Sequence, residues 1–119
     1  MIPKQSVGRA MKISLRGTLL LLKERSFRIQ IFIGIVITFL GFYFEIESWA
    51  WVAQITSIGL VLMAEGINTV IERIADIVQP EYDPKIGNIK DMAAGFVGIM
   101  ALTASLVAVI IYAPKFGLV

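Results

Sequence analysis

The chain has 119 residues, of which 57% are hydrophobic and only 17% are charged, and its formal net charge is +2. Because soluble domains carry about 25% charged and about 45–50% apolar residues, this composition favours a membrane protein. The chain contains no cysteine and no histidine, which excludes disulfides, Cys/His zinc sites, Ser-His-Asp triads and imidazole bases, so acid–base chemistry must use carboxylates, Lys or Tyr.

Residues 6–24 are predicted to form an amphipathic helix. Basic residues recur there at spacings of three, four and seven, which places on one helical face Arg9, Lys12, Arg16 and Lys23. Leucines occupy another face, so the helix is suited to lie in the membrane interface, although packing on the protein itself is the alternative. No small-residue cleavage site follows, so we expect the segment to be retained and not removed as a signal peptide.

Three apolar stretches suited to cross a bilayer follow, at about 27–45, 49–78 and 91–113. The second opens at Trp49 and Trp51, residues typical of the membrane interface. Residues 79–91 contain two prolines and one glycine, which predicts a polar loop without a continuous helix. The sequence therefore predicts an all-α membrane protein, a single domain over residues 1–119, with three transmembrane helices plus the N-terminal amphipathic helix.

The distribution of Lys and Arg predicts the orientation of these helices. Seven lie up to Arg28, at the start of the first stretch, and none lies in the first loop. Three lie from Arg73 to Lys90, between the apolar parts of the second and third stretches, and one follows the third. By the positive-inside rule, the N-terminus and the loop at 79–91 face the cytoplasm, and the C-terminus faces outward. We therefore expect a multi-pass protein of the plasma membrane.

Polar residues continue the helical pattern of the second stretch beyond its apolar part. Glu65, Asn68, Glu72 and Asp76 are spaced by three, four and four, so they share one helix face, spread over roughly 80°. Glu65 lies about 24 Å along the helix from Trp49, just inside the edge of a hydrocarbon core about 30 Å thick. The sequence thus predicts a ladder of polar groups that runs from the bilayer edge into the cytosol.

This ladder suits phosphoryl transfer to an alcohol at the membrane surface. A carboxylate at the hydrocarbon edge is costly without a partner and can act as a general base. The lower acids, near Lys85, Lys90 and Asp91, have the oxygen ligands that Mg²⁺ needs together with phosphate oxygens. A solvated helix terminus is the alternative for Glu72 and Asp76, and a weaker alternative for Glu65 and Asn68. Neither a P-loop nor a G-x-G-x-x-G motif is present.

Three segments together resemble a known family. Residues 24–28 read E-R-S-F-R, residues 65–76 read E-G-I-N-T-V-I-E-R-I-A-D, and residues 90–94 read K-D-M-A-A. This arrangement resembles the prokaryotic diacylglycerol kinases, small integral-membrane lipid kinases that include undecaprenol kinases. The resemblance implies a bacterial inner-membrane enzyme that phosphorylates undecaprenol or diacylglycerol with ATP and Mg²⁺ at the cytoplasmic face.

The resemblance also implies roles for individual residues. It makes Glu65 the general base and Asn68 its polar partner in the catalytic site, and it makes Glu24 and Glu72 the ligands of the magnesium ion. The expected ATP-binding residues are Glu24, Glu72, Asp76, Glu81, Lys90 and Asp91, and those expected to bind the lipid substrate are Ser26, Phe27, Arg28 and Glu65. No nucleic acid is expected as a partner.

The family resemblance further implies a homotrimer with sites shared between subunits. Small residues recur in the third stretch at spacings of four and three, a pattern suited to close helix packing: Ala94, Gly98, Ala101, Ser105 and Ala108. The N-terminal element departs from the family, because Gly17 and Glu24 are seven residues apart and not eight. This shift rotates the helix by one residue, so no role is assigned to Arg9, Lys12 and Ser14.

Two other functions compete with the kinase. A small multidrug-type transporter subunit also has about this length and a membrane glutamate, but it would need four spans and a glutamate deep inside the bilayer. A non-catalytic membrane scaffold would leave the polar ladder incidental. Three predicted spans and a glutamate at the bilayer edge favour the lipid kinase.

Overall fold

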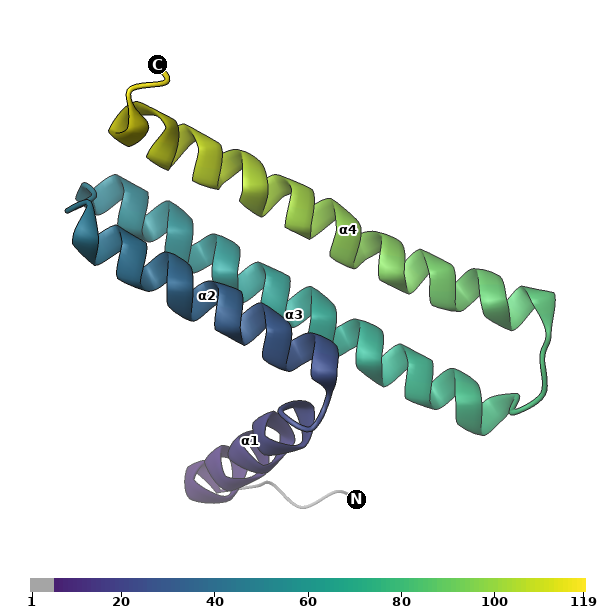
Figure 1. Cartoon of the computed structure of the whole chain (residues 1–119). Helices are drawn as coiled ribbons and strands as arrows, with labels where there is room; N and C mark the ends of the chain where they lie inside the picture. Colours follow the sequence, from purple (N-terminus) through teal and green to yellow (C-terminus); the bar gives the residue numbers. More distant parts are fainter. Residues whose placement is uncertain (1–5) are drawn as a thin grey trace.

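The computed structural model describes residues 6–119 and is built of helices (Figure 1). In chain order these are α1 (Val7–Leu21), α2 (Arg25–Tyr43), α3 (Ser48–Val78), α4 (Pro84–Tyr112) and the short 3-10 helix η1 (Ala113–Phe116). Three helices are long and apolar enough to cross a membrane, namely α2, α3 and the continuous helix from Pro84 to Phe116. The predicted fold class is therefore confirmed.

Helices α2, α3 and α4 lie side by side, whereas α1 diverges from the start of α2 (Figure 1). With 31 residues, α3 is about 46 Å long, well beyond the roughly 30 Å of a hydrocarbon core. Both α3 and α4 continue past the first residue of α2 (Figure 1). We call this extended part of the bundle, together with the α1–α2 junction, the junction end.

The break between α1 and α2 lies earlier in the chain than the sequence suggested. Helix α1 begins with Ser6, whose hydroxyl accepts a hydrogen bond from the Arg9 amide at 3.2 Å. It ends at Leu21 and not at residue 24. The guanidinium of Arg28 donates to the carbonyls of Leu22 and Lys23 at 3.0 and 2.9 Å, and so satisfies carbonyls that a helix end leaves without partners.

The prediction of a non-helical loop over 79–91 is wrong for most of that segment. Helix α4 begins at Pro84, so only residues 79–83 separate it from α3. The side chain of Asp83 accepts a hydrogen bond from the Lys85 amide at 2.8 Å, and Pro84 occupies the first helical turn. Proline is favoured at that position because its missing N–H needs no partner there. The same residues that suggested a loop therefore start the helix.

Two buried glycines of α2 let it approach α3 closely. Gly34 and Gly41 are seven residues apart on the same face. A Cβ on Gly34 would lie 3.0 Å from the Cγ2 atom of Ile58, and one on Gly41 would lie 2.7 Å from the Cη2 atom of Trp51. Such contacts leave no room for a side chain, so these positions set the distance between the two helices.

We expect the Gly41→Ala substitution to lower the free energy of unfolding by about 1–3 kcal/mol, because the added methyl group collides with the Trp51 ring. The matched control is Gly59→Ala in α3, where nothing lies within 4 Å of the added Cβ and alanine favours the helix. Thermal unfolding of both variants in the same detergent measures the difference. Equal stability of the two variants would contradict the close α2–α3 contact.

A polar cluster joins the three long helices at the end opposite the junction. Gln54 of α3 is 3% exposed and donates to the carbonyl of Ile37 in α2 at 3.3 Å. The hydroxyl of Tyr112 in α4 donates to the Gln54 side-chain oxygen at 2.5 Å. Ile46, Ala50 and Ile111 are buried around it. Buried hydrogen bonds of this kind fix the order of neighbouring membrane helices.

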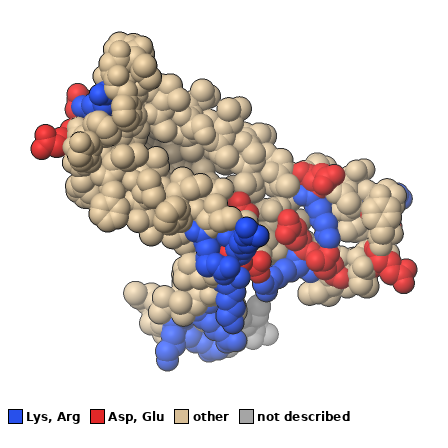
Figure 2. All heavy atoms as spheres, viewed as in Figure 1, with Lys and Arg blue, Asp and Glu red and all other residues tan. Residues whose placement is uncertain are grey.

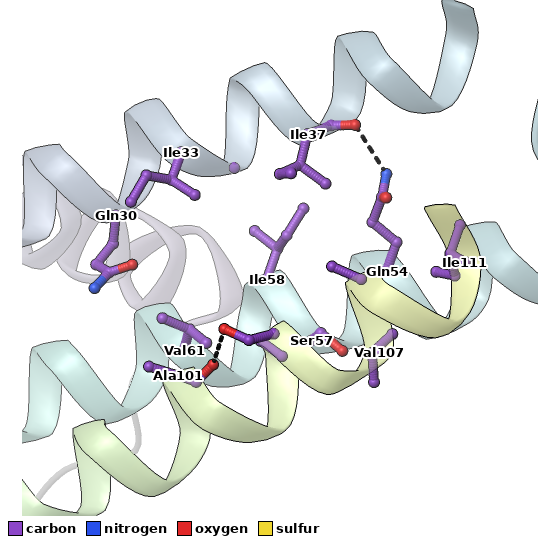
Figure 3. Close-up of a pocket in the computed structure, with 14 residues that line it drawn as sticks. Gln30, Ile33, Ile37, Gln54, Ser57, Ile58, Val61, Ala101, Val107 and Ile111 are labelled. Atoms are coloured by element: carbon purple, nitrogen blue, oxygen red, sulfur yellow. Dashed lines mark hydrogen bonds between the residues drawn. The ribbon is translucent and has the colours of Figure 1, made fainter. Parts of the chain in front are cut away.

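Between these helices lies a cavity of about 280 Å³ (Figure 3). Its wall is mostly aliphatic, with a few uncharged polar side chains, namely Gln30, Gln54, Ser57 and Ser105. No charged residue lines it. Along α3 its lining stops at Val61, one helical turn before Glu65, so the cavity approaches the acidic residues but does not include them.

Candidate functional site

Figure 2 shows charged side chains at one tip of the bundle and again from the α1–α2 junction to the other tip, with an uncharged stretch between the two groups. Lys and Arg cover α1 and the start of α2, and acidic groups lie on the neighbouring part of α3 and beyond (Figure 2). Glu45, Glu47 and Lys115 belong to the opposite end. Most of the ionisable groups, and all of the predicted site residues, therefore belong to the junction end.

Glu65 lies on the buried face of α3 and is only 6% exposed. Val61 and Asn68 are buried on the same face. Over residues 6–119, no hydrogen bond or ion pair engages the Glu65 carboxylate. Its oxygens are not among the fully enclosed side-chain atoms that lack a partner, so the carboxylate keeps some access to solvent. A carboxylate at this depth of a membrane helix is still costly, and its retention points to a chemical use.

Asn68 and Glu72 form the next step of the ladder. The Asn68 side-chain amide donates to the Oε1 atom of Glu72 at 3.1 Å. Asn68 is 8% exposed, and its Oδ1 atom is the buried side-chain oxygen that has no partner among the described residues. Since buried polar atoms are nearly always hydrogen-bonded, the Asn68 oxygen is suited to accept a hydrogen bond from a bound ligand.

The α1–α2 junction is joined to α3 by an ion pair between Glu24 and Arg73. These residues are 49 positions apart in the chain. Glu24 precedes the first residue of α2, and Arg73 directly follows Glu72 in α3. The ion pair therefore brings Glu24 to the same level of α3 as Glu72, so both carboxylates belong to one part of the bundle.

A second ion pair, between Asp76 and Lys90, joins α3 to α4. The contact at the other end, Gln54 with Tyr112, is 22 residues away along both helices. Glu65 is 11 residues from Gln54, and the residue 11 positions from Tyr112 is Ala101. This register puts small residues of α4 roughly level with the ladder: Ala101 with Glu65, Gly98 with Asn68 and Ala94 with Glu72.

The remaining predicted residues lie less close to the ladder. Glu81 is exposed in the segment between α3 and α4, and Asp91 is exposed on α4. Ser26 and Arg28 are exposed in the first turn of α2, whereas Phe27 is 6% exposed. A Cβ on Gly66 would lie 4.0 Å from the Phe27 ring and 3.4 Å from Leu21. Phe27 thus packs on α3 beside Glu65. Arg28 donates hydrogen bonds to the carbonyls of Leu22 and Lys23, between α1 and α2.

The acidic side chains of the junction end offer a small set of ligands for a metal ion. Within residues 6–119, no group of three or more acidic residues is close enough to enclose one. Magnesium is usually bound by one or two carboxylates, with phosphate oxygens and water as its other ligands. Glu24 and Glu72, drawn to one level of α3, fit that smaller requirement.

Sequence reasoning missed Arg73, which it counted only as one of the positive charges that orient the chain. Its ion pair with Glu24 depends on the angle between the α1–α2 junction and α3. The signal was a single basic residue inside an otherwise acidic and apolar stretch. The polar cluster of Gln54 and Tyr112 was also missed. Each of these residues is a single polar side chain in an apolar helix, and its sequence position does not indicate a partner.

The chain matches the family described as prokaryotic diacylglycerol kinase over residues 12–112. It is also 28% identical over 92 residues to the undecaprenol kinase of Bacillus subtilis (strain 168). That match covers 77% of this chain and 75% of the relative. The family match includes every predicted site residue from Glu24 to Asp91.

Proposed function

This chain belongs to the prokaryotic diacylglycerol kinase family and is a lipid kinase with an alcohol acceptor, and from that premise we propose that it transfers the γ-phosphoryl group of ATP to undecaprenol or diacylglycerol. The observation that carries the proposal is the Glu65 carboxylate, 6% exposed and without a hydrogen-bond partner among residues 6–119. Its distance along α3 from Trp49 corresponds to the edge of the bilayer, where a lipid hydroxyl lies.

In the proposed reaction Glu65 is the general base. Its carboxylate takes the proton of the lipid hydroxyl as that oxygen forms a bond to the γ-phosphorus. The bond between the γ-phosphorus and the bridging oxygen of ADP breaks, and ADP leaves with the electron pair. The buried oxygen of Asn68 is suited to accept a hydrogen bond from the lipid, and the small residues of α4 that are level with Glu65 and Asn68 leave space for its head.

We propose that Glu24 and Glu72 hold the magnesium ion of Mg-ATP. When bound, the ion supplies charge neutralisation at the phosphate oxygens. Asn68 fixes the Glu72 carboxylate through its 3.1 Å hydrogen bond, and Glu24 is kept near it by Arg73. The proposed nucleotide contacts are completed by Asp76, Glu81, Lys90 and Asp91, of which Lys90 and Asp76 already form an ion pair.

The lipid is proposed to approach along the start of α2. Ser26 and Arg28 are exposed there, and Phe27 packs beside the Glu65 region of α3. The positive-inside rule supports placing this junction end at the cytoplasmic face of a bacterial inner membrane, with the C-terminus outside. A homotrimer with shared sites is part of the proposal. It is supported by the exposure of Ala94, Gly98 and Ser105 on α4.

The purified protein in lipid nanodiscs, supplied with radiolabelled ATP and Mg²⁺, is expected to phosphorylate undecaprenol or diacylglycerol, with undecaprenol the better acceptor. The two lipids are compared side by side at equal mole fraction, and labelled product is separated by chromatography. A reaction without Mg²⁺ is the control for the metal. The absence of labelled product with either lipid would refute the proposed activity.

A further inference from the structure

Arg73 is the one basic side chain of α3, and it contacts a proposed metal ligand. Its guanidinium pairs with Glu24, and its side chain is 61% exposed whereas that of Glu24 is 30% exposed. It follows Glu72 directly in the chain. The cation thus contacts one of the two carboxylates that the proposed function assigns to magnesium and is the chain neighbour of the other, although that function assigns it no role.

The acids around the proposed metal site call for a cation close to them, in addition to the Lys and Arg side chains that cover α1 and the start of α2. Four acids, Glu24, Glu65, Glu72 and Asp76, belong to this part of the bundle. Carboxylates repel the phosphate chain of a nucleotide, so positive groups must compensate. Among the described residues, the two cations in ion pairs with these acids are Arg73 and Lys90. A guanidinium is planar and always charged, and its N–H groups match phosphate oxygens.

Glu24 pairs with Arg73 through one oxygen, Oε1, and a divalent cation bound to that oxygen would repel the guanidinium. Resting on the proposed function, we propose that Arg73 is a nucleotide-binding residue whose guanidinium pairs with Glu24 in the free protein and with the phosphate chain in the complex. Its high exposure leaves the long side chain free to exchange partners. Before nucleotide binds, the same ion pair keeps the α1–α2 junction against α3.

A purely structural role for the ion pair is the competing explanation. Exposed ion pairs contribute little to stability because water and salt screen them. A structural Arg73 would act only through Glu24, so its replacement would have no effect once Glu24 is neutral. A phosphate-binding Arg73 would still matter in that background. The two explanations therefore differ in the double variant Glu24→Gln/Arg73→Gln.

The test measures equilibrium binding of the non-hydrolysable analogue AMP-PNP to the full chain in nanodiscs, with and without Mg²⁺. Arg73→Gln is expected to weaken binding by about 10–100-fold, the range for loss of a charged hydrogen bond, in both conditions. Arg73→Lys is expected to recover part of the loss. The control Arg16→Gln removes the same charge from α1 and is expected to bind within about twofold of the wild type.

Kinetics provide a second readout. Arg73→Gln is expected to raise the KM for Mg-ATP by a similar factor while the KM for the lipid stays unchanged. In the double variant, binding weaker than that of Glu24→Gln alone supports the proposal, and equal binding overturns it. A wild type that phosphorylates lipid while Arg73→Gln binds the analogue equally well overturns the role of Arg73 alone. A wild type that neither binds nor transfers overturns the proposed function as well.

Discussion

Replacing Glu65 with Gln is expected to lower the rate of phosphate transfer to the lipid by about 10²–10⁴-fold, the usual contribution of a general base. The amide has nearly the same shape as the carboxylate and cannot take a proton. Glu65 is 6% exposed and has no hydrogen-bond partner within residues 6–119, so the substitution removes a charge that is costly at this depth of a membrane helix. We therefore expect the inactive variant to unfold at the same temperature as the wild type or a higher one.

The matched control is Glu47→Gln, which neutralises an exposed acid at the opposite end of the bundle and is expected to keep full activity. Glu65→Asp retains the carboxylate but withdraws it by one methylene group, so an intermediate rate is expected. Transfer of labelled phosphate and thermal unfolding are measured on the same preparations. Near-normal activity of Glu65→Gln would show that Glu65 is not the general base. A large loss of stability in this variant would show that Glu65 has a structural role.

The three long helices were predictable because the bilayer allows few alternatives. Backbone groups in hydrocarbon must bond within their own segment, so an apolar stretch of sufficient length forms a helix. The ends of helices lack this constraint. Pro84 reads as a helix breaker in sequence, yet it starts α4 because Asp83 caps the first turn. The end of α1 at Leu21 depends on Arg28, a residue of the following helix.

The polar ladder of α3 was predictable in its register and not in its partners. Spacing alone puts Glu65, Asn68 and Glu72 on one face. Spacing does not predict that Glu65 and Asn68 are buried whereas Glu72 is exposed. Burial depends on where α4 packs against α3. The pair of Glu24 with Arg73 depends in addition on the direction in which α1 leaves the bundle. The sequence shows that Arg73 is present, and only the arrangement of the helices shows that it pairs with Glu24.

Replacing Glu72 with Gln is expected to raise the Mg²⁺ concentration that gives half-maximal activity by at least about 10–100-fold. Loss of groups that merely support a metal ligand already costs that much, and Glu72 is proposed as a direct ligand. The side-chain amide of the Glu72→Gln variant keeps an oxygen that accepts the hydrogen bond from Asn68, 3.1 Å away in the wild type. The fold around the site is therefore expected to persist, and a Mg²⁺ titration at saturating ATP measures the effect.

Glu45→Gln provides the control, since Glu45 is exposed in the turn between α2 and α3, at the other end of the bundle. Its half-maximal Mg²⁺ concentration should equal that of the wild type. If Glu72 acts instead only by orienting Asn68, activity falls at every Mg²⁺ concentration and the midpoint stays in place. A shifted midpoint thus identifies a metal ligand, and an unshifted one identifies a positioning residue.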